Sequence, residues 1–177
     1  MKNKDVVISI DKGCYSVKIS GRANFEYAPV IRCLAKEIDV VNFKEISIDL
    51  AECIGMDSTF MGIIAMLGLK AHECNAVMNI VNANEQNKEL LIGLGIDRLI
   101  NFIYRDDTES TSEPETVIEC SEKPEDKQLN TAECVYEAHA TLMDIDEDNV
   151  AKFEKVVKYA KTDLDKLREK NDQKTDK

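Results

Sequence analysis

A β-strand followed by a loop and an apolar helix is the feature that most constrains the fold of this chain. Lys44 to Leu50 alternates around β-branched residues, which predicts a buried strand. A six-residue loop should follow, and from Phe60 to Leu67 apolar residues recur at helical spacing. Asp57 or Ser58 can cap this helix, because their side-chain oxygens accept hydrogen bonds from first-turn amides that lack partners. The sequence therefore predicts a strand, a loop and a capped helix.

The hydroxyl of Ser58 lies where a phosphate is well placed. Unpaired amides and the positive end of the helix dipole favour an anion there, by about 0.3 to 1 kcal/mol for an exposed charge. Phosphorylation would add about 1.5 to 2 negative charges beside Asp57, so a partner docking over an uncharged cap would then meet a dianion. The same Asp-Ser-Thr cluster is also typical of a helix cap that has no regulatory role.

The rest of residues 1–104 predicts strands that alternate with helices. Strands are expected at 6–10, 15–20, 77–81 and 99–104, and helices at 28–40 and from 84 or 85 to 91. The first two strands should form a hairpin, because a short turn containing glycine joins them. Alternation of this kind indicates an α/β fold with a mixed sheet and helical cover.

Acidic residues are concentrated in the C-terminal part of the chain. The net charge is −11, and residues 105–177 contribute 21 acidic and 12 basic side chains, a net of −9. Nucleic-acid binding needs a basic face and is therefore not expected. Residues 105–129 are polar and contain Pro114 and Pro124, which predicts an acidic flexible linker.

Two amphipathic helices are predicted in residues 130–170, ahead of a disordered tail at 171–177. Asn130 or Thr131 can cap the first helix, and the second should begin near Asp146 to Asp148, where acids suit the helix dipole. The apolar face of such a pair needs a cover. That cover is either the surface of the chain's own domain, a second copy of the chain or a dedicated partner.

Several functional classes find no support in the sequence. No run of about 18 apolar residues is present, and the N-terminus lacks a cleavage signature, so a cytoplasmic protein without a membrane span is expected. The six cysteines are scattered, which predicts reduced thiols rather than disulfides or a metal site. No Walker loop or GxGxxG motif occurs, and no cofactor is expected.

Two blocks of sequence resemble the STAS domain of bacterial anti-sigma-factor antagonists. The first is Met56-Asp57-Ser58-Thr59 with Gly62 four residues after the serine, and the second runs from Leu90 to Leu99, preceded by Asn82-Ala83-Asn84. The resemblance covers about residues 5–104. It implies a STAS-like domain over residues 1–104, with the linker and the helical pair as additions.

The resemblance also implies a function, which is partner switching. In that family the serine after the aspartate is phosphorylated by an anti-sigma factor that is a serine kinase of the histidine-kinase-like ATPase fold, and a PP2C-type phosphatase removes the phosphate. The unphosphorylated form binds the anti-sigma factor and so releases a sigma factor. By resemblance Ser58 is the phosphosite, and the partner-binding surface comprises Asn24, Asp57, Ser58, Thr59, Phe60 and Met61.

The sequence departs from the family's pattern at two of these positions. Phe60 stands where the family usually has glycine, so its ring either narrows the choice of partner or packs inward. Asn24 stands where relatives often carry an acid that helps in kinase contact.

Two other functions compete with partner switching. STAS domains also act as non-switching adaptor subunits of transport or stress-sensing complexes, which would retain the serine as a cap. A hydrolase would need Ser58 together with His72 and either Asp57 or Asp49. His72 lies about 14 residues along the same predicted helix, roughly 20 Å from Ser58. An enzyme is therefore not expected.

Overall fold

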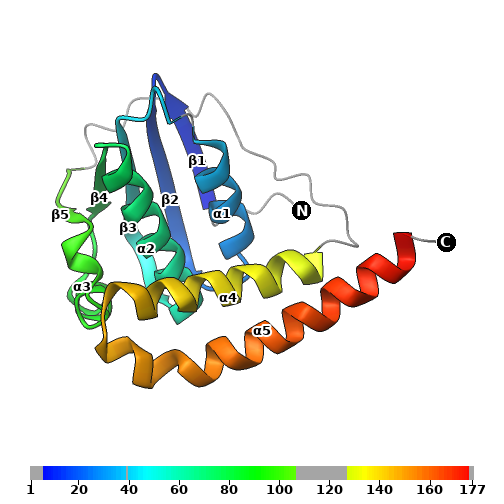
Figure 1. Ribbon diagram of the computed structural model, residues 1–177. Coiled ribbons are helices and arrows are strands. Elements are labelled where there is room, and N and C mark those ends of the chain that lie inside the picture. The colour runs from blue at the N-terminus through cyan, green and yellow to red at the C-terminus, as the bar shows by residue number, and fades with distance from the viewer. Residues whose placement is uncertain (1–5, 39, 107–126, 176–177) are drawn as a thin grey trace.

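A five-stranded mixed sheet forms the centre of the fold in the computed structural model, which describes residues 6–38, 40–106 and 127–175 (Figure 1). The first two strands form the predicted antiparallel hairpin, and each later strand is added in parallel. In sheet order the strands are β1 (Val6–Asp11), β2 (Cys14–Ala23), β3 (Glu45–Met56), β4 (Val77–Val81) and β5 (Asn101–Ile103). The predicted α/β class with a mixed sheet is confirmed.

The helices build layers outward from this sheet. They are α1 (Ala28–Glu37), α2 (Ser58–Glu73), α3 (Glu85–Ile92), the 3-10 helix η1 (Ile96–Arg98), α4 (Lys127–Ile145) and α5 (Asp148–Thr175). Helix α2 packs on β3 and β4, and α1 lies beside α2. Helix α4 crosses both α1 and α2, and α5 lies along the outer side of α4 (Figure 1). We refer to α4 and α5 together as the helical hairpin.

Strand β3 is longer than predicted. The expected six-residue loop before Asp57 is wrong, because β3 continues through Met56. The extension is held by β2, which is also long and pairs Ala23 with Met56 after two register shifts. Glu52 reinforces the pairing, since its carboxylate contacts Lys18 at 2.8 Å and accepts a hydrogen bond from Ser20 at 2.6 Å. Strand β3 therefore leads directly into the cap of α2.

The helical hairpin differs from the prediction at both ends. Helix α4 begins at Lys127, so neither Asn130 nor Thr131 caps it, and the Thr131 hydroxyl donates to the Lys127 carbonyl within the helix at 2.8 Å. Helix α5 begins at Asp148 as predicted but continues to Thr175, into the segment for which a disordered tail was expected. Most of the predicted acidic linker, residues 107–126, lies outside the described residues.

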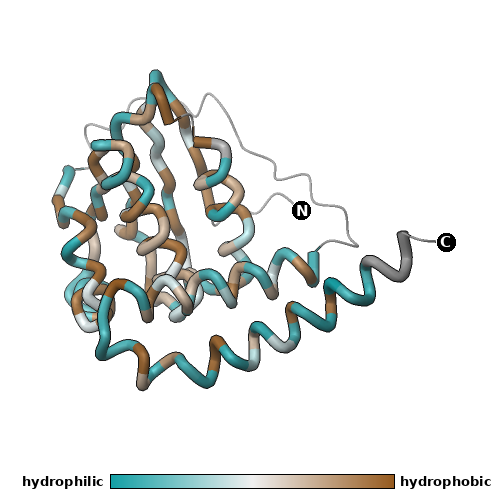
Figure 2. The backbone as a smooth tube through the Cα atoms, viewed as in Figure 1, coloured by the Kyte–Doolittle hydropathy of each residue, from teal (hydrophilic) through white to brown (hydrophobic). Residues whose placement is uncertain are grey.

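One hydrophobic core runs from the sheet through α2 into α4. Its fully buried members include Ile46 and Ile48 of β3 and Ile64 of α2. Cys134, Ala138 and Leu142 of α4 belong to the same cluster and are also fully buried. Helix α5 is hydrophilic along most of its length, with single apolar residues recurring along it (Figure 2). The core therefore ends at α4, and α5 shields the outer side of that helix.

Candidate functional site

Asp57 closes the N-terminus of α2 and ties it to a neighbouring loop. Its backbone is extended, and its Oδ1 accepts a hydrogen bond from the Phe60 amide at 2.8 Å. Its Oδ2 accepts a second bond from the Phe25 amide, also at 2.8 Å. The sequence allowed either Asp57 or Ser58 to cap α2, and the structure shows that Asp57 is the cap. Ser58 becomes the first helical residue, and its hydroxyl is available for another contact.

The hydroxyl of Ser58 contacts a histidine from α4. Ser58 Oγ lies 2.9 Å from His139 Nε2, although 81 residues separate the two in sequence. His139 Nδ1 lies 2.7 Å from the Val135 carbonyl, which can only accept, so Nδ1 carries a proton. In the neutral ring Nε2 is then the acceptor, and the Ser58 hydroxyl donates to it. Ser58 is half-buried, while His139 is buried with its ring edge against Phe153.

The other predicted partner-binding residues lie around this contact. Thr59, Phe60 and Met61 are all buried beneath the surface of the domain. Phe60 is fully buried and belongs to the core, so its ring packs inward. Asn24 is half-buried in the loop before α1, where its Oδ1 accepts from the Glu26 amide at 2.9 Å. The bond between Asp57 and Phe25 brings this loop to the start of α2.

His139 is the residue that sequence reasoning missed. No spacing pattern links it to Ser58, because α4 reaches α2 only through the tertiary fold. His72, the histidine considered for a hydrolase, lies in the last turn of α2, at the opposite end from Ser58. The fold therefore pairs Ser58 with a different histidine from the one in the hydrolase hypothesis.

Replacing Asp57 by alanine should lower the free energy of unfolding by about 1 to 2 kcal/mol, because the cap of α2 is lost. The Phe25 amide loses its acceptor in the same variant. Asp57→Asn is the matched control, since its amide oxygen can still accept from the Phe60 amide, and we expect about half the loss. Urea denaturation followed by circular dichroism measures both variants. Equal stability of wild type and Asp57→Ala would contradict the assigned cap.

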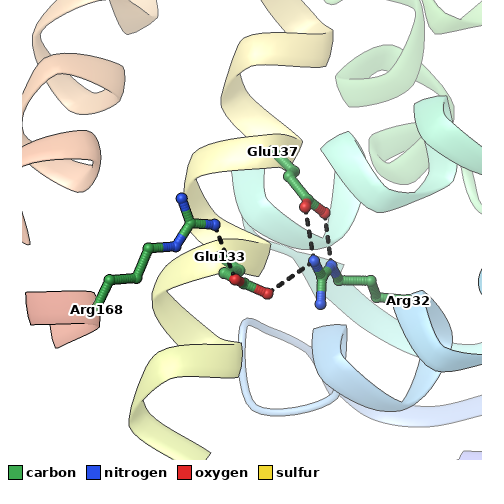
Figure 3. Close-up of polar contacts among 4 residues, drawn as sticks. All are labelled: Arg32, Glu133, Glu137 and Arg168. Carbon is green, nitrogen blue, oxygen red and sulfur yellow. Dashed lines mark hydrogen bonds and ion pairs between the residues drawn. The ribbon is translucent and has the colours of Figure 1, made fainter. Parts of the chain in front are cut away.

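A network of charges fastens α4 to α1 and α5 (Figure 3). Arg32 of α1 is buried, and its guanidinium makes two bonds to the Glu137 carboxylate, at 2.5 and 2.6 Å, and one to Glu133 at 3.0 Å. Glu133 also accepts a bond from Arg168 of α5 at 3.0 Å. The bonds to Glu137 raise the pKa of Arg32 above its usual value despite its burial.

Glu133 stays ionised between its two arginines. Burial alone would raise the pKa of this carboxyl, but the bond from Arg168 and the charge of Arg32 outweigh burial and lower the pKa below its usual value. Planar guanidinium groups suit this bridging geometry, because they offer several donors in a fixed fork. The network therefore links α1, α4 and α5 through two acids that both lie on α4.

The turn of the helical hairpin is anchored at the other end of the domain. Asn149 is fully buried, and its side-chain amide donates to the carbonyls of Leu94 and Leu142 at 3.0 and 2.8 Å. Asp146 contacts Arg98 at 3.0 Å. Gly95 has a φ of +73°, which favours glycine, and a Cβ there would lie 2.7 Å from an Asp146 carboxylate oxygen. The turn therefore rests on the connection between α3 and η1.

Comparison with solved structures identifies the fold. A candidate anti-sigma factor antagonist from Thermotoga maritima matches with a TM-score of 0.50 and 17% sequence identity, covering 63% of this chain and 95% of that chain. The chain has the fold of the anti-sigma factor antagonists. The antagonist SpoIIAA in its unphosphorylated form also matches, with a TM-score of 0.48, 12% identity and coverage of 59% of this chain and 90% of that chain.

The STAS-like fold inferred from two short sequence blocks is thereby confirmed. No protein-family model matches the sequence, and a search of curated proteins gives no match. The Thermotoga maritima protein is matched over nearly its whole length, so more than a third of the present chain lies beyond the shared STAS-like fold.

In residues 6–38, 40–106 and 127–175, no group of three or more His, Cys, Asp or Glu side chains is arranged to hold a metal ion. Within the same part of the chain, every helix is too short or too polar to cross a membrane.

Proposed function

We propose that this protein is a cytoplasmic anti-sigma-factor antagonist that acts by partner switching. In this proposal the chain binds an anti-sigma factor that is also a serine kinase when Ser58 is unphosphorylated. Phosphorylation of Ser58 releases that partner, and a PP2C-type phosphatase restores binding. The protein is a binding module in this scheme, and the kinase and the phosphatase supply the chemistry.

The observation that carries the proposal is the position of Ser58 in a STAS-like fold. Ser58 is the first residue of α2, directly after the Asp57 cap, and its hydroxyl takes no part in capping. The amides of the first helical turn and the helix dipole favour an anion at this point. The loop that contains Asn24 is joined to the same cap through Phe25. Together these features give a partner a compact surface whose charge one phosphate would change.

A second candidate function is favoured by the contact between Ser58 and His139. The hydroxyl is engaged by a buried imidazole at 2.9 Å, and α4 lies over the start of α2. A serine held in this way can serve as a purely structural hydrogen-bond donor. The chain would then be a non-switching STAS adaptor in a transport or stress-sensing complex.

Binding and phosphorylation assays with the kinases of the source organism separate the two functions. The purified full chain is incubated with ATP, Mg²⁺ and each serine kinase of the histidine-kinase-like ATPase fold, and its intact mass is measured. Partner switching predicts the addition of one phosphate to wild type and none to Ser58→Ala. Thr59→Val is the matched control, because it removes the neighbouring hydroxyl at nearly constant volume and should still accept one phosphate.

Affinity for the same kinases provides the second measurement. Ser58→Asp should bind at least about tenfold more weakly than wild type, because an unpaired charge at a docking surface costs more than the ~1.4 kcal/mol of one decade in affinity. Equal affinity of wild type and Ser58→Asp, together with no phosphorylation, would exclude switching and leave the adaptor function.

A further inference from the structure

Helix α2 is apolar on all sides and needs a cover on its outer face as well as its inner face. No charged residue occurs between Ser58 and Leu69, and ten of the 16 residues of α2 are buried. The sheet covers one side of this helix, and α4 crosses its first turns on the side that faces away from the sheet (Figure 1). A helix that is hydrophobic all round is stable only when it is buried all round. A cover on this face therefore stabilises α2, and in this structure α4 provides it.

The outer face of α2 receives α4 at very short range. A Cβ built on Gly62 would lie 2.5 Å from the Ala138 carbonyl oxygen and 2.7 Å from the Ala138 Cβ. The backbones can approach this closely only because one residue is glycine and the other is alanine. On either side of Ala138, Cys134 and Leu142 are spaced by one helical turn and are fully buried. Helix α4 thus presents a narrow apolar stripe that fits α2.

Ser58 lies at the edge of the same contact. A phosphoryl group on Oγ would need the space that the His139 ring now fills at 2.9 Å. The N-terminus of α2 favours an anion, but with α4 seated the dianion would lie against apolar side chains and next to Asp57, and both of these neighbours oppose the charge. A seated α4 and a phosphate on Ser58 therefore oppose each other. Because such coupling is reciprocal, a seated α4 should also hinder phosphorylation.

The helical hairpin is held together by contacts of its own. Helix α5 places Phe153, Val157 and Leu164 at helical spacing in half-buried or buried positions along α4. From residue 129 to residue 143, no residue of α4 is exposed, because the domain and α5 enclose it from both sides. Helix α4 would therefore keep its contacts with α5 if the hairpin moved away from α2.

Apart from the apolar stripe of α4, the contacts that attach the helical hairpin to the domain are largely polar. They include the bonds from Arg32 to Glu137 and Glu133, the pair of Arg98 with Asp146, and the bond from Lys152 to the Gly93 carbonyl. The buried Asn149 amide also donates to the Leu94 carbonyl. The Arg98 side chain is 66% exposed, and exposed ion pairs contribute little stability. Arg32 and Asn149 are buried, so their bonds resist opening more strongly. Release of these bonds together with the α4 stripe would free the hairpin as a unit, with the sheet and α1 still in place.

We propose that the helical hairpin is a displaceable lid on the outer face of α2, and that the partner binds this face through a helix that replaces α4. The partner helix has an apolar stripe with a small residue where α4 has Ala138. This inference rests on the proposed function for the identity of the partner, but the displacement of the lid can be measured without any partner.

Two buried cysteines report lid opening in the full chain. Cys134 lies on α4 and is fully buried, and Cys53 is buried in β3, within the sheet. Opening of the lid exposes Cys134 alone, whereas global unfolding exposes both. Native chain is pulsed with N-ethylmaleimide, and peptide mass spectrometry gives the labelling rate of each cysteine. In wild type we expect Cys134 to react faster than Cys53.

The Gly62→Ala variant forces the lid open by steric overlap. Alanine also forms helices better than glycine, so α2 itself should not be weakened. Because overpacking destabilises the closed contact, we expect Cys134 to be labelled about 10- to 100-fold faster than in wild type. The labelling rate of Cys53 should not change. Gly55→Ala is the matched control, because a Cβ there meets no atom within 4 Å. Ser58→Glu provides an independent variant and should also accelerate labelling of Cys134.

The outcomes are distinct from those that test the proposed function. Equal labelling rates for Cys134 and Cys53 in wild type, Gly62→Ala and Ser58→Glu would overturn the lid, because α4 would then open only with global unfolding. If a kinase phosphorylates Ser58, Gly62→Ala should be phosphorylated faster than wild type and Gly55→Ala at the wild-type rate. Unchanged phosphorylation of Gly62→Ala would overturn the gating role. If no kinase acts on any variant, the proposed function fails while selective labelling of Cys134 still supports the lid.

Discussion

Replacing Phe60 by alanine is expected to lower the free energy of unfolding by about 3 to 5 kcal/mol. The ring is fully buried in the core, so its removal loses apolar burial and leaves a cavity that the surrounding side chains refill only in part. Urea denaturation monitored by circular dichroism measures the loss. Phe25→Ala is the matched control, because its ring is 47% exposed and the same substitution should cost far less.

The Phe60 result also bears on the choice of partner. The sequence left open whether this ring narrows the choice of partner or packs inward, and in the structure it packs inward. We therefore expect Phe60→Leu, which keeps an apolar group in the core, to preserve affinity for any partner that wild type binds. A loss of stability below about 1 kcal/mol in Phe60→Ala would show that the ring lies outside the core.

Removing Glu137 is expected to cost about 2 to 3 kcal/mol, because it strips a buried cation of its bidentate acceptor. Arg32 has an 8% exposed side chain, so solvent cannot take the place of the lost carboxylate. The cost stays at the lower end for a broken buried pair, because Glu133 still accepts from Arg32 and Glu137 is itself about one-third exposed. The measurement compares urea denaturation of Glu137→Ala with that of wild type.

A double variant distinguishes loss of the pair from loss of packing. Arg32→Met combined with Glu137→Met replaces both partners by apolar side chains of similar length, which often restores stability. We expect the double variant to be more stable than Glu137→Ala. If Glu137→Ala were as stable as wild type, the network would be no more than a surface contact. Because the network joins α1 to α4, labelling of Cys134 should also rise in Glu137→Ala and return toward the wild-type rate in the double variant.

Sequence patterns predicted the STAS-like domain well because its signals are local. Alternation marked the strands, and Asp57 was one of two named caps for α2. Local signals failed where long-range pairing decided the outcome. Residues 51–56 contain no typical strand pattern, and β2 holds them in the sheet through a register that sequence alone does not reveal. The predicted loop was wrong for that reason.

Sequence spacing does not predict the contact between Ser58 and His139, but the sequence does indicate that the helix of Ser58 is covered. Between Ser58 and Leu69 every residue is uncharged, which is unusual for a helix with one face to solvent. The predicted tail helices carried apolar stripes that needed a cover. When one chain carries two apolar faces without a cover, here the outer face of α2 and the stripe of a tail helix, the two faces are expected to pack together. Which residue of α4 reaches Ser58, however, depends on the depth and angle of packing.

The tight crossing of α4 over Gly62 determines how far α4 can slide along α2. The acids that hold Arg32 are one helical turn apart, so a shift of α4 by one turn would exchange Glu137 for Glu133 and keep an ion pair. The same shift would bring the larger Cys134 over Gly62, where even a Cβ on that glycine has no room against Ala138. Glycine and alanine thus fix the longitudinal register of α4. Each time α4 returns to the domain, it brings the same imidazole to the same serine.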